Sequence, residues 1–331
     1  MPERCTRVSS SATGQFKYDF DGILINIELV RLNDIQECPV YISLKQDAGE
    51  ETVKKWSELV RELIIGPLTR ISLDIGTALP KKVVLFSSQK IPGMPEYDML
   101  AYDEDLLIDA QGFLQYARFL TLEHMMGVLS HELAHIKRFR ESFNTIGLNV
   151  PLLCFPKKVF KGASKKEQQE IRVRETKMII NSLLDVHDNM LLSDFLAECY
   201  IKFRLAAMFF EGIKAISAGA NSFTMKFKIS LPGGLADLVS VSHTASHFKL
   251  IDYELMFQNY IKKAFGKNAD QEIRSILDHA MERVEVGKNP IPVYEDIKVD
   301  LEEKLGQVEK LEREISGKVT KISSTEHAYE F

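Results

Sequence analysis

Residues 128–136 read Val-Leu-Ser-His-Glu-Leu-Ala-His-Ile, and the spacing of His131, Glu132 and His135 in this stretch decides how the rest of the chain is interpreted. On an α-helix, side chains at positions i and i+4 lie on the same face, so the imidazoles of His131 and His135 can ligate one Zn²⁺ ion. Glu132 lies beside them, where its carboxylate can take a proton from a metal-bound water. The pattern is typical of zinc-dependent proteases and predicts a metal centre on this helix.

The residues before the motif predict that it belongs to a largely buried helix. Apolar side chains recur there at helical spacing, at Leu120, Leu122, Met125, Met126, Val128 and Leu129. Two histidines and a glutamate inside such a helix are costly to bury unless a metal ion or hydrogen bonds satisfy them. The alternative is an amphipathic helix whose polar face carries these residues without a metal.

Two histidines do not complete a catalytic zinc site, which needs three protein ligands and an open position. The extended motif with a third histidine is excluded, because Arg138 stands where its glycine would be and Glu141 where its histidine would be. The downstream segment 193–200 offers Asp194 and Glu198, again at positions i and i+4. One of these carboxylates can ligate the metal while the other hydrogen-bonds a ligating histidine. The alternative for the pair is a solvated acidic helix face.

The stretch Val-Leu-Ser-His-Glu-Leu-Ala-His-Ile-Lys resembles the active-site helix of the gluzincins, which include the heat-shock membrane protease and the CAAX prenyl proteases. The phage-immunity-region metallopeptidases are similar. The resemblance implies that the third ligand comes from a downstream Glu-x-x-Ala-Asp or Glu-x-x-Ala-Asn motif. This chain has Asp194-Phe-Leu-Ala-Glu198, with the acids exchanged, so register favours Asp194 as the ligand and residue type favours Glu198.

Composition favours an ordinary globular protein. The 331 residues are 45% hydrophobic and 27% charged, which is enough for one large domain or two modest ones. A net charge of -5 argues against nucleic acid as a partner, since nucleic-acid-binding domains are usually strongly basic. The four cysteines show no Cys-x-x-Cys spacing, and no apolar run has the length of a membrane span, so we expect a cytoplasmic protein.

The expected fold class is α+β and zincin-like, with a small mixed sheet packed on the active-site helix and a mainly helical C-terminal part. Residues 1–15 are polar and predicted to be disordered, and residues 16–215 are predicted to form the metallopeptidase domain. A helical region with a strand near 223–231 is expected over residues 216–320, followed by a flexible tail over 321–331. Within it, residues 300–319 are predicted to form a charged amphipathic helix whose role is packing or self-association.

The expected function is zinc-dependent hydrolysis of peptide bonds in a peptide or protein substrate, with the metal-bound water activated by Glu132. The alternative is a non-catalytic metal-binding regulatory or interaction protein with a zincin-like fold. Another side chain is usually needed to stabilise the oxyanion. Residues of suitable type are His187, Tyr200, His243, His247 and Tyr253, and a helical spacing from Asp194 singles out His187. For His124 we expect a local hydrogen bond rather than ligation.

Overall fold

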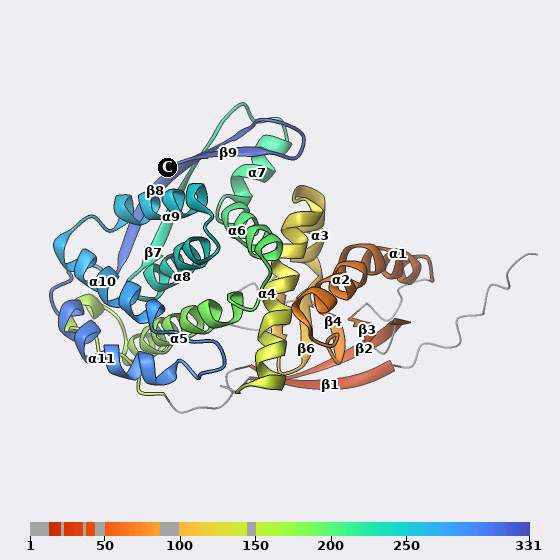
Figure 1. Ribbon diagram of the computed structural model, residues 1–331, viewed down its shortest axis with the longest axis horizontal. Coiled ribbons are helices and arrows are strands. Elements are labelled where there is room, and N and C mark those ends of the chain that lie inside the picture. The colour runs from red at the N-terminus through yellow and green to blue at the C-terminus, as the bar shows by residue number, and fades with distance from the viewer. Residues whose placement is uncertain (1–12, 21–22, 36–37, 44–49, 87–98, 144–149) are drawn as a thin grey trace, which may run out of the picture. The chain divides into compact units, whose positions relative to one another are not determined.

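The computed structural model describes residues 13–20, 23–35, 38–43, 50–86, 99–143 and 150–331 (Figure 1). The chain divides into two compact units after Arg118. The first unit holds a mixed sheet with helices, and the second holds the helix of the His-Glu-x-x-His motif, further helices and a small antiparallel sheet. The predicted α+β class is therefore confirmed. The division after Arg118 differs from the predicted organisation, in which one domain extended from residue 16 to residue 215.

The sheet of the first unit has the strand order β1-β2-β3-β4-β6-β5. Its strands are β1 (Thr13–Phe20), β2 (Ile23–Ile35), β3 (Cys38–Ile42), β4 (Lys82–Phe86), β5 (Met99–Tyr102) and β6 (Asp105–Asp109). The pairs β3/β4 and β4/β6 are parallel, and the other pairs are antiparallel. Parallel strands are typically covered on both faces and read as continuous apolar runs, and residues 83–86 of β4 are all buried.

Three helices complete the first unit. They are α1 (Glu50–Val60), α2 (Gly66–Ile75) and α3 (Ala110–Phe119), and one π-helical turn (Arg61–Ile65) joins α1 to α2. Helix α1 runs through the π-helical turn into α2, whose C-cap is Gly76. Gly76 has φ 65°, a left-handed conformation that glycine adopts without the steric penalty of a side chain.

The second unit surrounds the motif with helices. Its elements are α4 (Leu122–Glu141), a 3-10 turn (Lys157–Phe160), α5 (Lys165–Asn189), α6 (Asp194–Met208), α7 (Phe210–Ser217), β7 (Phe223–Ser230), α8 (Gly233–His247), α9 (Ile251–Ala264), α10 (Asn268–Glu282), α11 (Ile291–Leu305), β8 (Glu312–Lys321) and β9 (His327–Glu330). Helix α4 packs against α5 and α6, and α8 packs against the same two helices (Figure 1). These four helices bring the polar side chains described below together.

The C-terminal predictions are corrected by the structure. Helix α11 ends at Leu305, and residues 312–321 form β8, which pairs with β7 and β9 in an antiparallel sheet. The helix predicted over 300–319 is thus wrong beyond residue 305, and self-association through it loses its structural basis. Residues 327–330 form β9, so the predicted flexible tail over 321–331 is also wrong. The first error arises because β7 lies about 90 residues before its partner β8, a pairing that no local pattern announces, whereas β9 pairs with the neighbouring β8.

The predicted disordered N-terminus over 1–15 falls almost entirely outside the described residues, which begin at Thr13. Among the helices that the structure describes, none combines the length and the apolar character needed to cross a bilayer.

Candidate metal centre

Helix α4 carries the two histidines because its N-terminus is well capped and its middle is tightly packed. The Thr121 hydroxyl accepts a hydrogen bond from the His124 N–H at 3.4 Å, and the His124 Nδ1 accepts one from the Thr121 N–H at 3.1 Å. The local hydrogen bond predicted for His124 is therefore confirmed. One turn before His131, a Cβ atom added at Gly127 would lie 2.3 Å from the carbonyl oxygen of Cys199, so only glycine allows α6 to approach α4 this closely.

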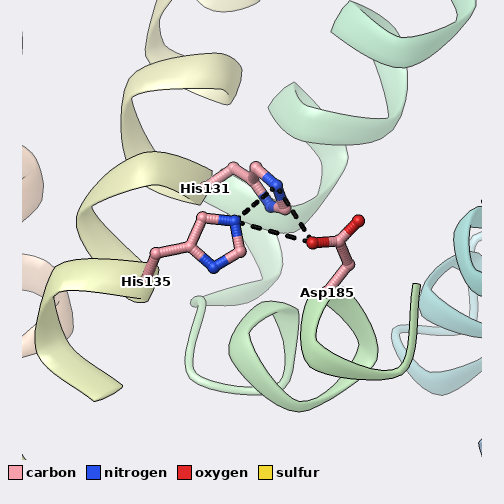
Figure 2. A group of neighbouring side chains, drawn as sticks. All are labelled: His131, His135 and Asp185. Atoms are coloured by element: carbon pink, nitrogen blue, oxygen red, sulfur yellow. Dashed lines mark hydrogen bonds and ion pairs between the residues drawn. The ribbon is translucent and has the colours of Figure 1, made fainter. Parts of the chain in front are cut away.

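His131, His135 and Asp185 form a compact group that could hold a metal ion (Figure 2). The two Nε2 atoms lie 3.1 Å apart, and the Asp185 Oδ1 lies 3.6 Å from the Nε2 of His131 and 3.5 Å from that of His135. Zinc–ligand distances of about 2.0–2.2 Å make the edge of a tetrahedron about 3.3 Å. The three donor atoms thus already have nearly the spacing that one tetrahedral ion requires.

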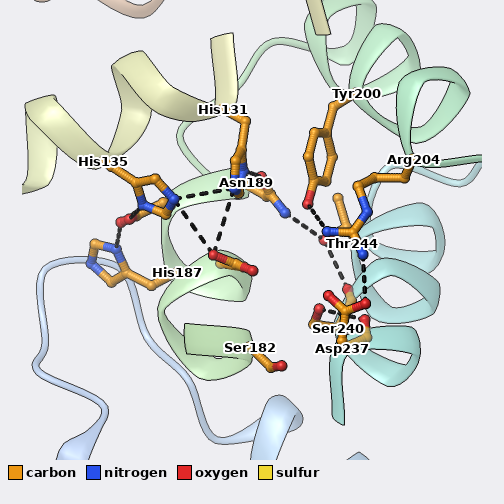
Figure 3. A network of polar contacts seen from close by, with 12 residues as sticks. His131, His135, Ser182, His187, Asn189, Tyr200, Arg204, Asp237, Ser240 and Thr244 are labelled. Carbon is orange, nitrogen blue, oxygen red and sulfur yellow. Dashed lines mark hydrogen bonds and ion pairs between the residues drawn. The ribbon is translucent and has the colours of Figure 1, made fainter. Parts of the chain in front are cut away.

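The second ring nitrogen of His131 is held by a buried chain of hydrogen bonds (Figure 3). Its Nδ1 lies 2.8 Å from the Oδ1 of Asn189, and the Nδ2 of Asn189 donates to the Thr244 hydroxyl at 3.2 Å. That hydroxyl in turn donates to the carbonyl of Ser240 at 2.9 Å. Since Asn189 uses its amide nitrogen on Thr244, its oxygen faces the ring and accepts the Nδ1 proton. His131 therefore presents the lone pair of Nε2 to the metal position.

The second ring nitrogen of His135 is held by Asp188. The His135 Nδ1–H donates to Oδ2 of this fully buried carboxylate. Arg138, one turn after His135, donates its Nε–H to both oxygens of Asp188 at 2.8 and 3.0 Å. The neighbouring His187 donates from Nδ1 to Oδ1 at 2.6 Å. A carboxylate behind a metal-ligating histidine fixes the ring and increases its basicity, so this is the arrangement that a metal site needs.

Burial and charge give the four titratable groups different proton affinities. Burial and the adjacent His135 hold the pKa of His131 well below its ordinary value. For His135, burial acts to lower the pKa, but the Asp188 carboxylate outweighs it and raises the pKa to about 9. Burial raises the pKa of Asp185 to about 7, whereas His135 holds the pKa of Asp188 far below its usual range despite burial. Before a cation binds, His135 is thus the protonated ring, and its Nε2–H points to the Nε2 of His131.

Glu132 and Tyr200 complete the surroundings of the triad. Glu132 is 7% exposed and follows His131 on α4, and its charge contributes to the raised pKa of His135. The Tyr200 ring stacks on His131 with centroids 4.5 Å apart, and burial raises the pKa of its phenol. Arg204 donates from Nη1 to the Tyr200 oxygen at 3.5 Å and from Nη2 to Asp237 at 2.6 Å (Figure 3). The site therefore contains a carboxylate and two hydrogen-bond donors next to the candidate ligands.

The structure does not bring Asp194 or Glu198 into the group with His131 and His135. Asp194 is exposed in the first turn of α6, directly after the N-cap Ser193. Glu198 is 40% exposed and pairs with Lys202 at 2.9 Å on the same helix. The prediction of the third ligand is therefore revised to Asp185, which α5 places opposite α4. The gluzincin resemblance implied a glutamate at this position, and the residue that the fold supplies is an aspartate.

The residues predicted as candidates for oxyanion stabilisation differ in whether they contact a candidate metal ligand. His187 is engaged behind Asp188, so the structure places it as a support of the site rather than as a group that faces a substrate. His243 and His247 lie at the C-terminal end of α8, where burial and the neighbouring His247 lower the pKa of His243, and Tyr253 lies on α9 near the charges of Lys202 and Glu198. Only Tyr200 among the five contacts a candidate ligand directly in the described part of the chain.

The sequence around Asp185 indicates an acid buried within a helix. The segment Asp185-Val-His-Asp188-Asn189 has an acid followed three and four residues later by polar residues, and it is preceded by the apolar pair Leu183 and Leu184. An acid in such a buried helical stretch requires a partner, whereas Asp194 follows a serine that marks a helix start.

Comparisons with protein-family models, with curated proteins and with solved structures found no match to this chain.

Proposed function

We propose that this chain is a zinc-dependent peptidase in which His131, His135 and Asp185 hold the ion and Glu132 is the general base. The observation that carries the proposal is the triad itself, with three donor atoms at tetrahedral spacing and both imidazoles fixed through their Nδ1 atoms. Imidazole and carboxylate donors at this spacing suit zinc. The described residues supply three ligands rather than four, which is the pattern of catalytic rather than structural zinc.

When bound, zinc supplies a Lewis acid that polarises a carbonyl and makes water acidic enough to attack it near neutral pH. In this proposal Glu132 takes a proton from that water and returns it to the leaving amine, a role supported by its burial and by the effect of its charge on His135. Asp188 keeps the ring of His135 oriented. Tyr200, which stays protonated because burial raises its pKa, and Arg204 are donors of the type that stabilises a developing oxyanion.

The competing function is a regulatory or interaction protein that binds the ion without catalysis. It is disfavoured by the buried carboxylate of Glu132 next to the triad, since a purely structural site has no use for a base. An amide at position 132 tests the difference. We expect Glu132→Gln to bind zinc as tightly as the wild type and to lose about 10²–10⁴-fold in peptide hydrolysis, the usual contribution of a general base.

The assay should use a complex peptide library read by mass spectrometry, because an enzyme with one dedicated substrate is inert on generic proteins. Glu198→Gln is the matched control, since it also replaces a glutamate by an amide but on the exposed side of α6. Undiminished hydrolysis by Glu132→Gln would overturn the assignment of the base. A zinc-loaded wild type that cleaves nothing in the library would favour the non-catalytic alternative.

A further inference from the structure

A chain of hydrogen bonds through the buried His187 and Asp188 leads from the candidate metal centre to the turn between α10 and α11. Behind His135, the Asp188 carboxylate accepts a hydrogen bond from His187 at 2.6 Å (Figure 3). The other ring nitrogen of His187, Nε2, accepts a hydrogen bond from the Gly287 N–H at 2.7 Å. His187 and Asp188 are both fully buried, so neither can exchange these partners for water.

The partners of His187 determine where its proton lies. A backbone N–H can only donate, so Nε2 of His187 must be the accepting nitrogen. The ring proton is then on Nδ1, where it is donated to Asp188. His187 therefore holds the Asp188 carboxylate through Nδ1 and the N–H of Gly287, 100 residues away in the sequence, through Nε2.

That loop is a tight turn around Gly287. The Lys288 N–H donates to the carbonyl of Glu285 at 3.1 Å, which closes a four-residue turn. Gly287 occupies its third position with φ +81°, a conformation that favours glycine. The turn itself is exposed, with Val286 52% accessible, yet its Gly287 N–H is aimed at a buried histidine.

We propose that His187 is a positioning residue that couples occupancy of the metal centre to the order of the 285–288 turn. The inference rests on the proposed metal site, because the coupling passes through His135 and Asp188. A cation bound to Nε2 of His135 fixes that ring, the ring fixes Asp188 through its Nδ1–H, and Asp188 fixes His187. The turn is then held most firmly when the metal is bound.

Two substitutions separate the two hydrogen bonds of the His187 ring. His187→Asn places an amide near the position of Nδ1, so it keeps a donor for Asp188 and loses the acceptor for Gly287. His187→Gln places an amide near the position of Nε2, so it keeps an acceptor for Gly287 and loses the donor. Zinc affinity is measured on the full chain by competition with a chromophoric chelator, and hydrogen exchange of the Gly287 amide is measured with and without zinc.

In the wild type, we expect zinc to slow exchange of the Gly287 amide. His187→Gln should bind zinc about tenfold more weakly, the lower end of the usual loss when the support of a ligand is removed, and His187→Asn should stay within about threefold of the wild type. The Gly287 amide should exchange fast in His187→Asn, and slowly but without response to zinc in His187→Gln. Equal zinc affinities in all three proteins would overturn the proposal.

The wild type alone also tests the coupling, should either variant fail to fold. A wild type that binds zinc with no change in Gly287 exchange would refute the coupling and leave the peptidase proposal intact. A wild type that binds zinc and slows Gly287 exchange, but cleaves no peptide, would remove the peptidase proposal and leave the coupling intact. A wild type that takes up no zinc would overturn both.

Discussion

Replacing Asp185 by asparagine tests the revised ligand set, because it removes one negative charge and leaves the shape of the side chain unchanged. The Asp185 Oδ1 lies within 3.6 Å of both Nε2 atoms, so it is the only group that completes a three-donor site in the described part of the chain. Structural zinc sites with four ligands bind with about 10–16 kcal/mol, or roughly 2.5–4 kcal/mol for each ligand. We therefore expect Asp185→Asn to weaken zinc binding about 10²–10³-fold.

The same substitution should not destabilise the metal-free protein. Burial raises the pKa of Asp185 to about 7, which means that the folded chain holds this carboxylate at a cost. A neutral amide of the same size avoids that cost. The midpoint of thermal unfolding without metal should accordingly stay equal or rise, while the increase in the midpoint on adding zinc should largely disappear.

Asp194→Asn and Glu198→Gln are the matched controls, since each removes one negative charge from α6. Glu198 loses only a partly exposed pair with Lys202, a type of interaction worth about 0–1 kcal/mol. Zinc affinity, measured by chelator competition, should stay close to that of the wild type in both. Loss of zinc in either control with retention in Asp185→Asn would refute the reasoning and restore the ligand that the sequence suggested.

Zinc binding should release a proton at neutral pH, because the pKa of His135 is raised to about 9. The apparent zinc affinity should therefore weaken about tenfold per pH unit from pH 9 to 7, and more steeply below pH 7, where Asp185 also gains a proton. Titration calorimetry in buffers of different ionisation enthalpy measures the released proton, and a zinc affinity independent of pH would contradict the prediction. Gly127→Ala should lower the free energy of unfolding by about 1–3 kcal/mol through overpacking, and it should weaken zinc binding. The control Gly66→Ala, whose added Cβ meets only an ordinary contact at 3.4 Å, should do neither. Equal denaturation midpoints for the two variants would refute the close crossing of α4 and α6. Asn189→Ala should weaken zinc binding about 10–100-fold by freeing the ring of His131, and unchanged binding would show that this support is dispensable.

The sequence predicted the part of the site that depends on local spacing. His131 and His135 are one helical turn apart, so a capped helix is sufficient to bring their rings together, and α4 confirms that helix. The third donor depends on how two later helices pack, and both carry a pair of polar residues at i and i+4. Asp194 is exposed at the start of α6 and Asp185 is 13% exposed within α5, a difference that the sequence expresses only weakly through the neighbouring serine and leucines.

The sequence also predicted those parts of the fold that depend on local patterns, and not those that depend on long-range pairing. The strand predicted near 223–231 from the alternation of its side chains is confirmed as β7, Phe223–Ser230. Leu305, Val308, Leu311 and Ile315 recur every three or four residues, a spacing that predicts a helix up to residue 319, although residues 312–321 form a strand. In the structure Ile315 and Val319 are both buried in β8, whose pairing with the distant β7 selects the strand. Long-range pairing is invisible to a local pattern.

A crystal structure of the zinc-loaded protein with anomalous scattering recorded at the zinc edge tests the proposed centre most directly. We expect one zinc peak about 2.0–2.2 Å from the Nε2 atoms of His131 and His135 and from a carboxylate oxygen of Asp185, with the fourth position held by water. A peak bound by Asp194 or Glu198, or one closed by a fourth protein ligand, would contradict it.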